Sequence, residues 1–354
     1  MKPETLDDLW QALAAVSAAP RHAERVMRLW SQALPQTHGK RPLEAFLPAT
    51  LRAALPAFEA RLAAIAQLRS AHPGADGGER LLVDLADGQT VESVLLPRDG
   101  LCISSQVGCA VGCRFCMTGR DGLLRQLTDA EMVAQVALGR QRRPVRKVVF
   151  MGMGEPAHNL DAVQSAIELL GTHGNIAHKQ LVFSTVGDPR VFERLPRGRV
   201  RPALALSLHS TFAARRRELL PRAPQMTPAE LVEAADTYAR ETDYPVQYQW
   251  TLLEGVNDGD DEIEGLVTLM TGRHGVLNLI PFNAVQGSGY QRPPHERCVE
   301  MTRELNRRHI YTRLRQSAAQ DVDGGCGQLR ARAPDTPQTV IFERNRPPAP
   351  VSAG

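Results

Sequence analysis

Cys109-Ala110-Val111-Gly112-Cys113-Arg114-Phe115-Cys116 is a short segment that carries three cysteines at the spacing C-x3-C-x2-C. A loop this short brings three thiolates around one centre. Three cysteine ligands suit a cubane iron–sulfur cluster whose fourth iron stays open to a substrate or cofactor. A structural zinc site is the alternative, but zinc takes four ligands, usually as two spaced pairs, so Cys102 would have to be the fourth. The spacing therefore favours the cluster.

Beyond this segment, short apolar runs alternate with helical stretches from about residue 100 onward. The expected strands are Leu101–Ser105, Lys147–Met151, Leu181–Thr185, Ala203–His209, Val246–Leu253, Val276–Phe282 and Ile310–Arg315. Capping boxes that start at Thr128 and Thr227 predict the beginnings of two of the helices between them. Repeated strand–helix units with buried, β-branched strands indicate an α/β fold with a parallel sheet. We expect a full or partial parallel β/α barrel, in which the chemistry collects at the carboxyl ends of the strands.

The regions that flank this core have other patterns. Apolar residues recur at helical intervals between residues 5 and 70, and Leu81–Leu85 and Thr90–Leu96 enclose an Asp-Gly hairpin signal. We expect four parts: a helical N-terminal accessory domain and candidate RNA contact (1–70), a β-hairpin region (71–97), the barrel (98–330) and a disordered, proline-rich tail (331–354).

Composition places the chain among ordinary globular proteins. Of its 354 residues, 43% are hydrophobic and 23% are charged. No uncharged apolar run is long enough to span a membrane, and the acidic N-terminus lacks the apolar region of a secretory signal. We therefore expect a cytoplasmic protein whose clustered cysteines bind metal or catalyse rather than form a disulfide scaffold.

Arginine supplies most of the positive charge: 42 residues are basic, four of them lysines, and the net charge is +3. The arginines gather in four clusters around residues 140–147, 197–201, 215–222 and 303–315. Each cluster alone is typical of a solvated surface, but the bidentate guanidinium group suits phosphate. Together the clusters favour an RNA or phosphate partner, bound electrostatically near the barrel mouth and on the helical N-terminal region.

Further motifs extend the three-cysteine segment into a family resemblance. The segment has an aromatic residue before its last cysteine and resembles the radical SAM signature, which binds S-adenosylmethionine and a 4Fe–4S cluster. Five more segments stand in register with it: Leu101–Cys109 with Cys116–Gly119, Met151–Pro156, Ser207–His209, Asn278–Asn283 and Asp321–Leu329. Together they resemble the RNA adenine methyltransferases of the RlmN/Cfr family, and more closely those that modify carbon 2.

The resemblance assigns roles that the residues alone do not. It makes Cys326 the methyl-carrying cysteine, Cys102 its partner in a disulfide, and Glu92 a proton acceptor; by pattern alone, Cys326 is a loop thiol and Glu92 an exposed strand carboxylate. The cluster ligands that the resemblance implies are Cys109, Cys113 and Cys116. Its S-adenosylmethionine contacts are Gly154, Glu155, Ser184, Ser207, Leu208, His209 and Asn283, which otherwise look like a glycine turn and strand-end caps. Cys298 has no counterpart and is expected to pack in a helix.

The implied reaction is methylation of an adenine carbon in ribosomal RNA or transfer RNA, using two molecules of S-adenosylmethionine per turnover. It also implies an electron donor such as flavodoxin or ferredoxin, and we expect a monomer. Three alternatives remain: methylation at carbon 8 or of another RNA, radical chemistry on a peptide or small molecule, and a non-enzymatic zinc-binding RNA protein. Departures from the family pattern at residues 119–122, 188–190 and 210–214 concern the substrate.

Overall fold

A ten-stranded sheet forms the centre of the computed structural model, which describes residues 3–285 and 287–331. Its strand order is β1-β2-β3-β4-β7-β8-β9-β10-β11-β12. The strands are β1 (Ala66–Pro73), β2 (Glu79–Leu85), β3 (Thr90–Leu96), β4 (Gly100–Cys102), β7 (Lys147–Phe150), β8 (Leu181–Thr185), β9 (Ala203–Ser207), β10 (Val246–Leu252), β11 (Gly275–Pro281) and β12 (Thr312–Leu314). The expected strands from Leu101 onward all occur, most of them shorter than predicted.

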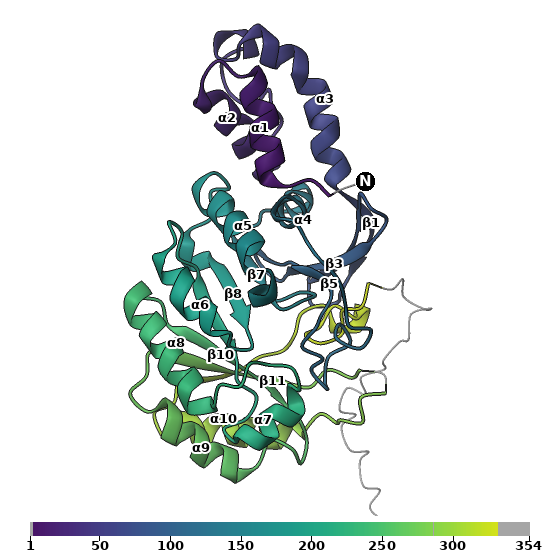
Figure 1. The fold of residues 1–354 in the computed structure, drawn as a ribbon. Coiled ribbons are helices and arrows are strands. Elements are labelled where there is room, and N and C mark those ends of the chain that lie inside the picture. Colours follow the sequence, from purple (N-terminus) through teal and green to yellow (C-terminus); the bar gives the residue numbers. More distant parts are fainter. Residues whose placement is uncertain (1–2, 286, 332–354) are drawn as a thin grey trace, which may run out of the picture.

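In this sheet order, each strand from β4 onward runs parallel to the next one as far as β12. These strands form a partial barrel, as predicted. Helices cover the outer face of this sheet (Figure 1). They are α4 (Asp129–Arg142), α5 (Leu160–Thr172), α6 (Pro189–Arg194), α7 (Ala213–Leu219), α8 (Pro228–Thr242), α9 (Asp260–Met270) and α10 (His295–Arg307). The capping boxes at Thr128 and Thr227 are both formed.

Side chains of the barrel strands alternate between the helices and the interior. In β10, Val246, Tyr248, Trp250 and Leu252 are buried, whereas the three residues between them are half-exposed. The half-exposed set faces inward, because successive strand residues point to opposite faces and the helices cover the other one. The barrel interior is therefore polar and reachable by solvent.

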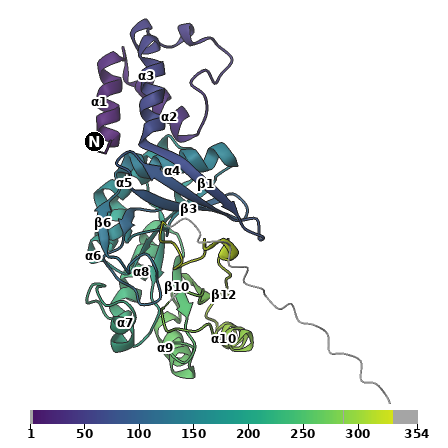
Figure 2. The same cartoon turned by 90° about the vertical axis from the view of Figure 1, so that its right-hand side faces the viewer.

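Three helices form the N-terminal region above the barrel (Figures 1 and 2). They are α1 (Leu6–Val16), α2 (Pro20–Ser31) and α3 (Ala49–Ile65). They dock on α4: the Leu6 N–H donates to Asp129 at 2.8 Å, and Arg140 donates to the Ser31 carbonyl at 2.6 Å. Residues 332–354, most of the expected tail, lie outside the described residues.

One sequence expectation about strands was wrong. Residues 66–70 belong to β1 rather than to a helix, because the antiparallel edge of β2 takes up their backbone hydrogen bonds. The predicted hairpin, β2 with β3, is present, and β3 pairs with β4 so that the hairpin extends the barrel sheet. A small sheet of β5 (Gln106–Gly108) and β6 (Leu123–Gln126) has no sequence counterpart. Among the described helices, none combines the length and apolar character needed to span a membrane.

Candidate active site

The three-cysteine segment is held at the carboxyl ends of the barrel strands by the β5–β6 hairpin. The Cys109 N–H donates to the Gly122 carbonyl at 2.9 Å, and the Cys116 N–H donates to the Cys113 carbonyl at 3.1 Å. Gly108 has a φ of +79°, and a Cβ there would lie 2.1 Å from the Gly122 carbonyl oxygen, so only glycine allows this closure. The loop also has a small apolar core of its own. Its members are Cys109, Val111, Phe115, Met117, Val186, Leu219, Leu220, Ala223, Leu253, Phe282 and Val285.

The thiols of the loop influence one another. Burial raises the pKa of Cys113, and the charges of Cys116 and Cys109 raise it further, so the three sulfur atoms are neighbours. Burial likewise raises the pKa of Cys109 to about 12. In the part of the chain that the structure describes, no group of three His, Cys, Asp or Glu side chains is arranged around a single metal ion. Three cysteines in one short loop are the donor set of an iron–sulfur cluster, in which each thiolate binds a different iron.

Glu155 is a buried carboxylate next to this loop. Its oxygens accept hydrogen bonds from the N–H groups of Ala157 (3.1 Å) and Val186 (3.0 Å). Burial raises the pKa of Glu155 to about 7, although these bonds and one from Thr185 lower it. A bound ammonium group would stabilise this carboxylate, which fits the predicted contact with S-adenosylmethionine. Gly154, with a φ of +111°, lets the chain pass Gln106, whose side chain would be 2.7 Å from a Cβ at this position.

His209 packs against Phe115 of the cysteine loop. Its Nδ1 accepts a hydrogen bond from the Thr251 N–H at 3.0 Å, and its ring meets Phe115 edge-on with ring centroids 4.8 Å apart. Burial, and then the charge of Arg216, lowers the pKa of His209 to about 3. The ring is therefore neutral with its proton on Nε2. It is placed as a support for Phe115, and its Nε2–H is a hydrogen-bond donor.

Three further predicted cofactor contacts, Ser184, Ser207 and Leu208, lie at or just after the ends of barrel strands. Ser184 and Ser207 are half-exposed at the ends of β8 and β9, as expected for side chains that point into the barrel. Leu208 is different, because its side chain is fully buried in the core and its carbonyl accepts from Arg216 at 3.1 Å.

Arg216 is a site residue that the sequence reasoning assigned to a surface cluster. It is 3% exposed and donates to the carbonyls of Leu208, Val186 and Ser207 at the ends of the strands. Burial lowers its pKa to about 10, while the charges of Cys113 and Glu155 raise it, so this cation lies near both of them. Arg222, which is exposed, donates to the Ala110 carbonyl at 3.0 Å. Only the buried backbone carbonyls around Arg216, which a sequence does not reveal, distinguish it from an exposed arginine.

The loop that carries Cys326 crosses the cysteine segment. The Met117 N–H donates to the Gly327 carbonyl at 2.7 Å, and the Thr118 hydroxyl donates to the Leu329 carbonyl at 2.7 Å. Asn283, a predicted cofactor contact, donates through Nδ2 to the Cys326 carbonyl at 2.9 Å, and its buried Oδ1 has no partner among the described residues. Cys326 is exposed. Desolvation of the thiol by the surrounding protein raises the pKa of Cys326, and the charge of Cys116 raises it further.

Cys102 lies at the end of β4, near Cys326. Burial raises the pKa of the Cys102 thiol, and the charge of Cys326 raises it further. The disulfide implied by the family resemblance is not formed, because both residues are free cysteines. Cys298, by contrast, is 1% exposed in the hydrophobic core on α10, which confirms its packing role.

Glu92 is fully buried, so the expectation of an exposed strand carboxylate was wrong. The C-terminal loop covers the face of β3 that alternation leaves open: the Ala331 N–H donates to Glu92 Oε1 at 2.7 Å. Arg80 donates to the same oxygen at 3.1 Å and to the Val322 carbonyl at 2.9 Å. Glu92 Oε2 has no hydrogen-bond partner within the described ranges. Burial raises the pKa of Glu92, and the charge of Arg80 opposes that effect.

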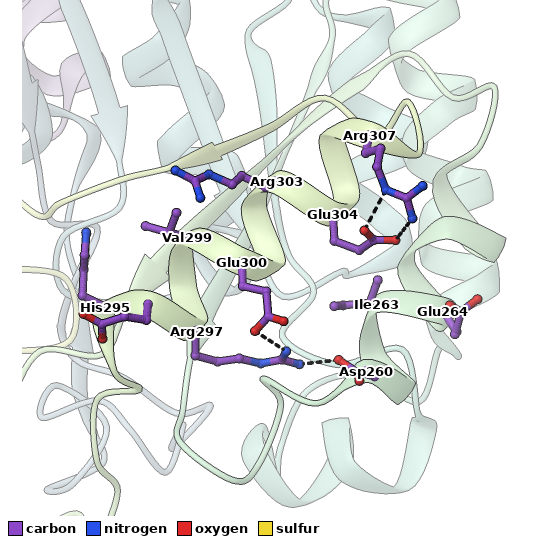
Figure 3. Close-up of a pocket in the computed structure, with 11 residues that line it drawn as sticks. Asp260, Ile263, Glu264, His295, Arg297, Val299, Glu300, Arg303, Glu304 and Arg307 are labelled. Carbon is purple, nitrogen blue, oxygen red and sulfur yellow. Dashed lines mark hydrogen bonds and ion pairs between the residues drawn. The ribbon is translucent and has the colours of Figure 1, made fainter.

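A separate groove of about 750 Å³ lies between α9 and α10 (Figure 3). Its walls carry ion pairs such as Arg297–Asp260 at 2.7 Å. It contains none of the predicted site residues. A smaller pocket of about 270 Å³, lined by Val107, Thr118, Met153 and Ala331 among others, lies beside the Cys326 and Glu92 region.

Comparisons with known proteins identify the superfamily and its relatives. The sequence model of the Radical SAM superfamily matches residues 103–267. The chain is 66% identical over 327 residues to a probable RNA methyltransferase of Aromatoleum aromaticum, covering 92% of each chain. It is 63% identical over 343 residues to a probable RNA methyltransferase of Ectopseudomonas mendocina, covering 96% of this chain and 99% of the relative. A crystal structure of a radical SAM methyltransferase from Sphaerobacter thermophilus matches with a TM-score of 0.80 at 33% identity, covering 93% of this chain and 98% of that one.

A partial parallel barrel with three cysteines at its strand ends, matched by the superfamily model, defines a radical SAM enzyme. Within that class, the chain belongs to the family of the probable RNA methyltransferases, whose members it matches over nearly their whole length.

Proposed function

We propose that this enzyme methylates an adenine carbon in RNA, most specifically carbon 2, through a methyl group carried on Cys326. The observation that carries the proposal is the placement of the Cys326 loop, which is hydrogen-bonded across the cluster loop and reaches both Cys102 and Glu92. A structural thiol would need no such connection. The names of the curated relatives supply RNA as the substrate class.

The cluster fits the residues present. Cys109, Cys113 and Cys116 would hold three irons, and Glu155 would accept hydrogen bonds from the ammonium group of S-adenosylmethionine. The cluster with S-adenosylmethionine supplies a radical that takes a hydrogen atom from a methyl group. Arg216 and His209 keep the strand ends and Phe115 in place around that centre.

The protein residues then divide the reaction among themselves. The Cys326 thiolate takes a methyl group from one S-adenosylmethionine, forming a C–S bond as the sulfonium C–S bond breaks. After a hydrogen atom has been removed, the carbon on Cys326 adds to adenine. The adduct then gives up its ring proton and one electron, for which a cluster held by Cys109, Cys113 and Cys116 would be the acceptor. Glu92 accepts that proton at Oε2, the oxygen that has no hydrogen-bond partner among the described residues.

Cys102 would complete the turnover. Its thiolate attacks the Cys326 sulfur, the C–S bond breaks with its electron pair on carbon, and protonation gives the methylated base. The product is a transient Cys102–Cys326 disulfide, which a thiol reductant reopens with two electrons. We further propose that each turnover uses two S-adenosylmethionine molecules and an external electron donor such as flavodoxin or ferredoxin. In this proposal the enzyme acts as a monomer in the cytoplasm, where ribosomal and transfer RNA are available.

Mass spectrometry of adenosines tests this function. Ribosomal and transfer RNA from a strain that lacks the gene should lack one methyladenosine, and the purified, reconstituted enzyme should restore it. Restoration at carbon 2 supports the proposal as stated, restoration at carbon 8 corrects the position, and unchanged RNA in both pools contradicts it.

A further inference from the structure

The inner face of β12 carries exposed charge and one exposed aromatic ring next to the Cys326 loop. Residues 311, 313 and 315 alternate with Thr312 and Leu314, so Tyr311, Arg313 and Arg315 share one face of this edge strand. All three are exposed, and Tyr311 is 55% exposed. Figure 2 shows β12 beside α10, which covers the opposite face of the strand.

These side chains are arranged as a continuous strip. The Arg313 guanidinium lies 5.0 Å from the centre of the Tyr311 ring and donates to its hydroxyl at 2.9 Å. Lys147 of β7 belongs to the same strip: burial lowers its pKa, and the charges of Arg315 and Arg313 lower it further. We call Tyr311, Arg313, Arg315 and Lys147 the β12 strip.

The β12 strip leads to the methyl-carrying cysteine. Ser317, two residues after Arg315, accepts a hydrogen bond from Asn283 Nδ2 at 2.9 Å, and the same Nδ2 donates to the Cys326 carbonyl at 2.9 Å. From Tyr311 to Arg315 the strand spans roughly 13 Å, enough for a short run of extended nucleotides.

The cations of this strip differ from several arginines of the clusters in their pairing. Arg142, Arg215 and Arg308 are paired with carboxylates. For the three cations of the β12 strip, no carboxylate lies within ion-pair distance in residues 3–285 and 287–331. Cations without carboxylates, next to an exposed aromatic ring, suit an anionic strand with bases that can stack.

We propose that the β12 strip binds the RNA strand adjacent to the target adenine, with a base stacked on Tyr311 and phosphates on Arg313 and Arg315. This inference rests on the proposed function, because it names the path by which RNA reaches Cys326. The strand then runs along the open edge of the partial barrel and delivers its adenine to the barrel mouth.

Binding of a short, fluorescently labelled single-stranded RNA containing adenine, measured by anisotropy over a range of salt, tests the proposal. In Tyr311→Leu the affinity should fall about fivefold or more, whereas Tyr311→Phe should bind as the wild type does because it keeps the ring. In the double variant Arg313→Gln/Arg315→Gln, the slope of log affinity against log salt should become shallower by about 1.4, or 0.7 for each lost phosphate contact. Arg313→Lys should keep most of that slope.

Arg303→Gln is the matched control. Arg303 is exposed on α10, on the other side of the sheet from the β12 strip. The substitution Arg303→Gln removes one positive charge, as Arg313→Gln does. Transfer of a labelled methyl group to Cys326 without RNA should be unchanged in Tyr311→Leu and Arg313→Gln, which shows that these variants are folded and bind S-adenosylmethionine. Equal RNA affinity and salt slope in the wild type and all strip variants would overturn the proposal.

Two further outcomes distinguish an RNA-binding strip from a surface for the electron donor, and from a failure of the proposed function. The strip binds the electron donor, and the proposal is wrong, if the strip variants keep their RNA affinity and flavodoxin reduces them more slowly than it reduces the wild type, while dithionite reduces both equally. If the wild type itself binds no RNA and methylates none, the proposed function fails rather than the assignment of this surface alone.

Discussion

Arg80 and Glu92 form an ion pair of 3.1 Å between the neighbouring strands β2 and β3, and both side chains are almost entirely buried. Arg80 also holds the Val322 carbonyl, four residues before Cys326. One cation therefore connects the proposed proton acceptor with the loop that carries the methyl group. A buried charge pair of this kind contributes to position more than to stability.

The first prediction concerns the pH dependence of methylation. Glu92 accepts a proton only when ionised, so activity should fall as the pH falls through the pKa of Glu92. Burial raises this pKa and Arg80 lowers it. In Arg80→Gln the pKa should therefore rise, and the acid limb of the single-turnover methylation rate should move to higher pH. An unshifted limb in a folded variant would show that Glu92 does not titrate in this step.

Replacing Glu92 itself separates proton transfer from methyl loading. Glu92→Gln should slow formation of methylated RNA by about 10²- to 10⁴-fold, the usual loss when a general base is removed. Methylation of Cys326 without RNA should continue, since that step removes no ring proton. The two rates are measured with labelled S-adenosylmethionine, and equal loss of both would indicate a folding defect.

The cysteine loop gives a spectroscopic prediction. Alanine at Cys109, Cys113 or Cys116 should remove the visible charge-transfer absorption and all activity, because the thiols are neighbours around one centre. Cys298→Ala, which removes a core thiol on α10, should keep the colour. Full cluster occupancy, measured by iron analysis, in a variant with all three cysteines replaced would contradict the assignment.

Local patterns were enough to predict the barrel and the cluster loop. Strand alternation, capping boxes and the cysteine spacing are short-range features, and the structure has the parallel strands where these features predict them. Contacts between distant segments could not be predicted in this way. Glu92 is buried because Ala331 reaches it across 239 residues, and β1 is a strand because β2 pairs with it.

Arg216 illustrates the same limit for charge. Its neighbours Arg215 and Arg217 give it the pattern of a surface cluster, yet three backbone carbonyls at the strand ends enclose its guanidinium group. An arginine that satisfies buried carbonyls and one that binds phosphate have the same sequence pattern. Only the burial of the surrounding strands distinguishes them.

His209 gives a prediction for stability. An unfolded histidine takes up a proton near pH 6.5, whereas the folded pKa of His209 is about 3, so protons bind the unfolded state first. This residue therefore costs nothing above pH 6.5 and lowers the free energy of unfolding progressively as the pH falls toward 3. Between pH 6.5 and pH 5 the loss should be at most about 2 kcal/mol.

His209→Asn should remove that part of the pH dependence. The Asn Oδ1 can accept from the Thr251 N–H as Nδ1 does, and asparagine tolerates the positive φ of 60° at this position. Urea unfolding followed by tryptophan fluorescence at both pH values measures the difference between the two proteins. Equal pH dependence in the wild type and the variant would mean that His209 titrates normally in the folded state.

The last prediction separates the roles of Cys326 and Cys102. Cys326→Ala cannot accept the first methyl group, so it should form neither methylated RNA nor a covalent adduct. Cys102→Ala should still load Cys326 and add to adenine, but without the attacking thiol it should stall with RNA attached. The charge of Cys326 raises the pKa of Cys102, which indicates that the two thiols lie in the same region of the protein. Structural thiols would instead show stability losses of about 1–3 kcal/mol and no trapped RNA.

A denaturing gel of each variant after anaerobic incubation with RNA and S-adenosylmethionine distinguishes these outcomes. A slow, RNase-sensitive band should appear only with Cys102→Ala, and Cys298→Ala serves as the matched control because it also removes one buried thiol. Adding S-adenosylmethionine labelled in its methyl group should place the label in that band, since the bridging carbon derives from the methyl on Cys326. Free methylated RNA at the normal rate from Cys102→Ala, or any turnover by Cys326→Ala, would show that methyl transfer does not pass through this pair.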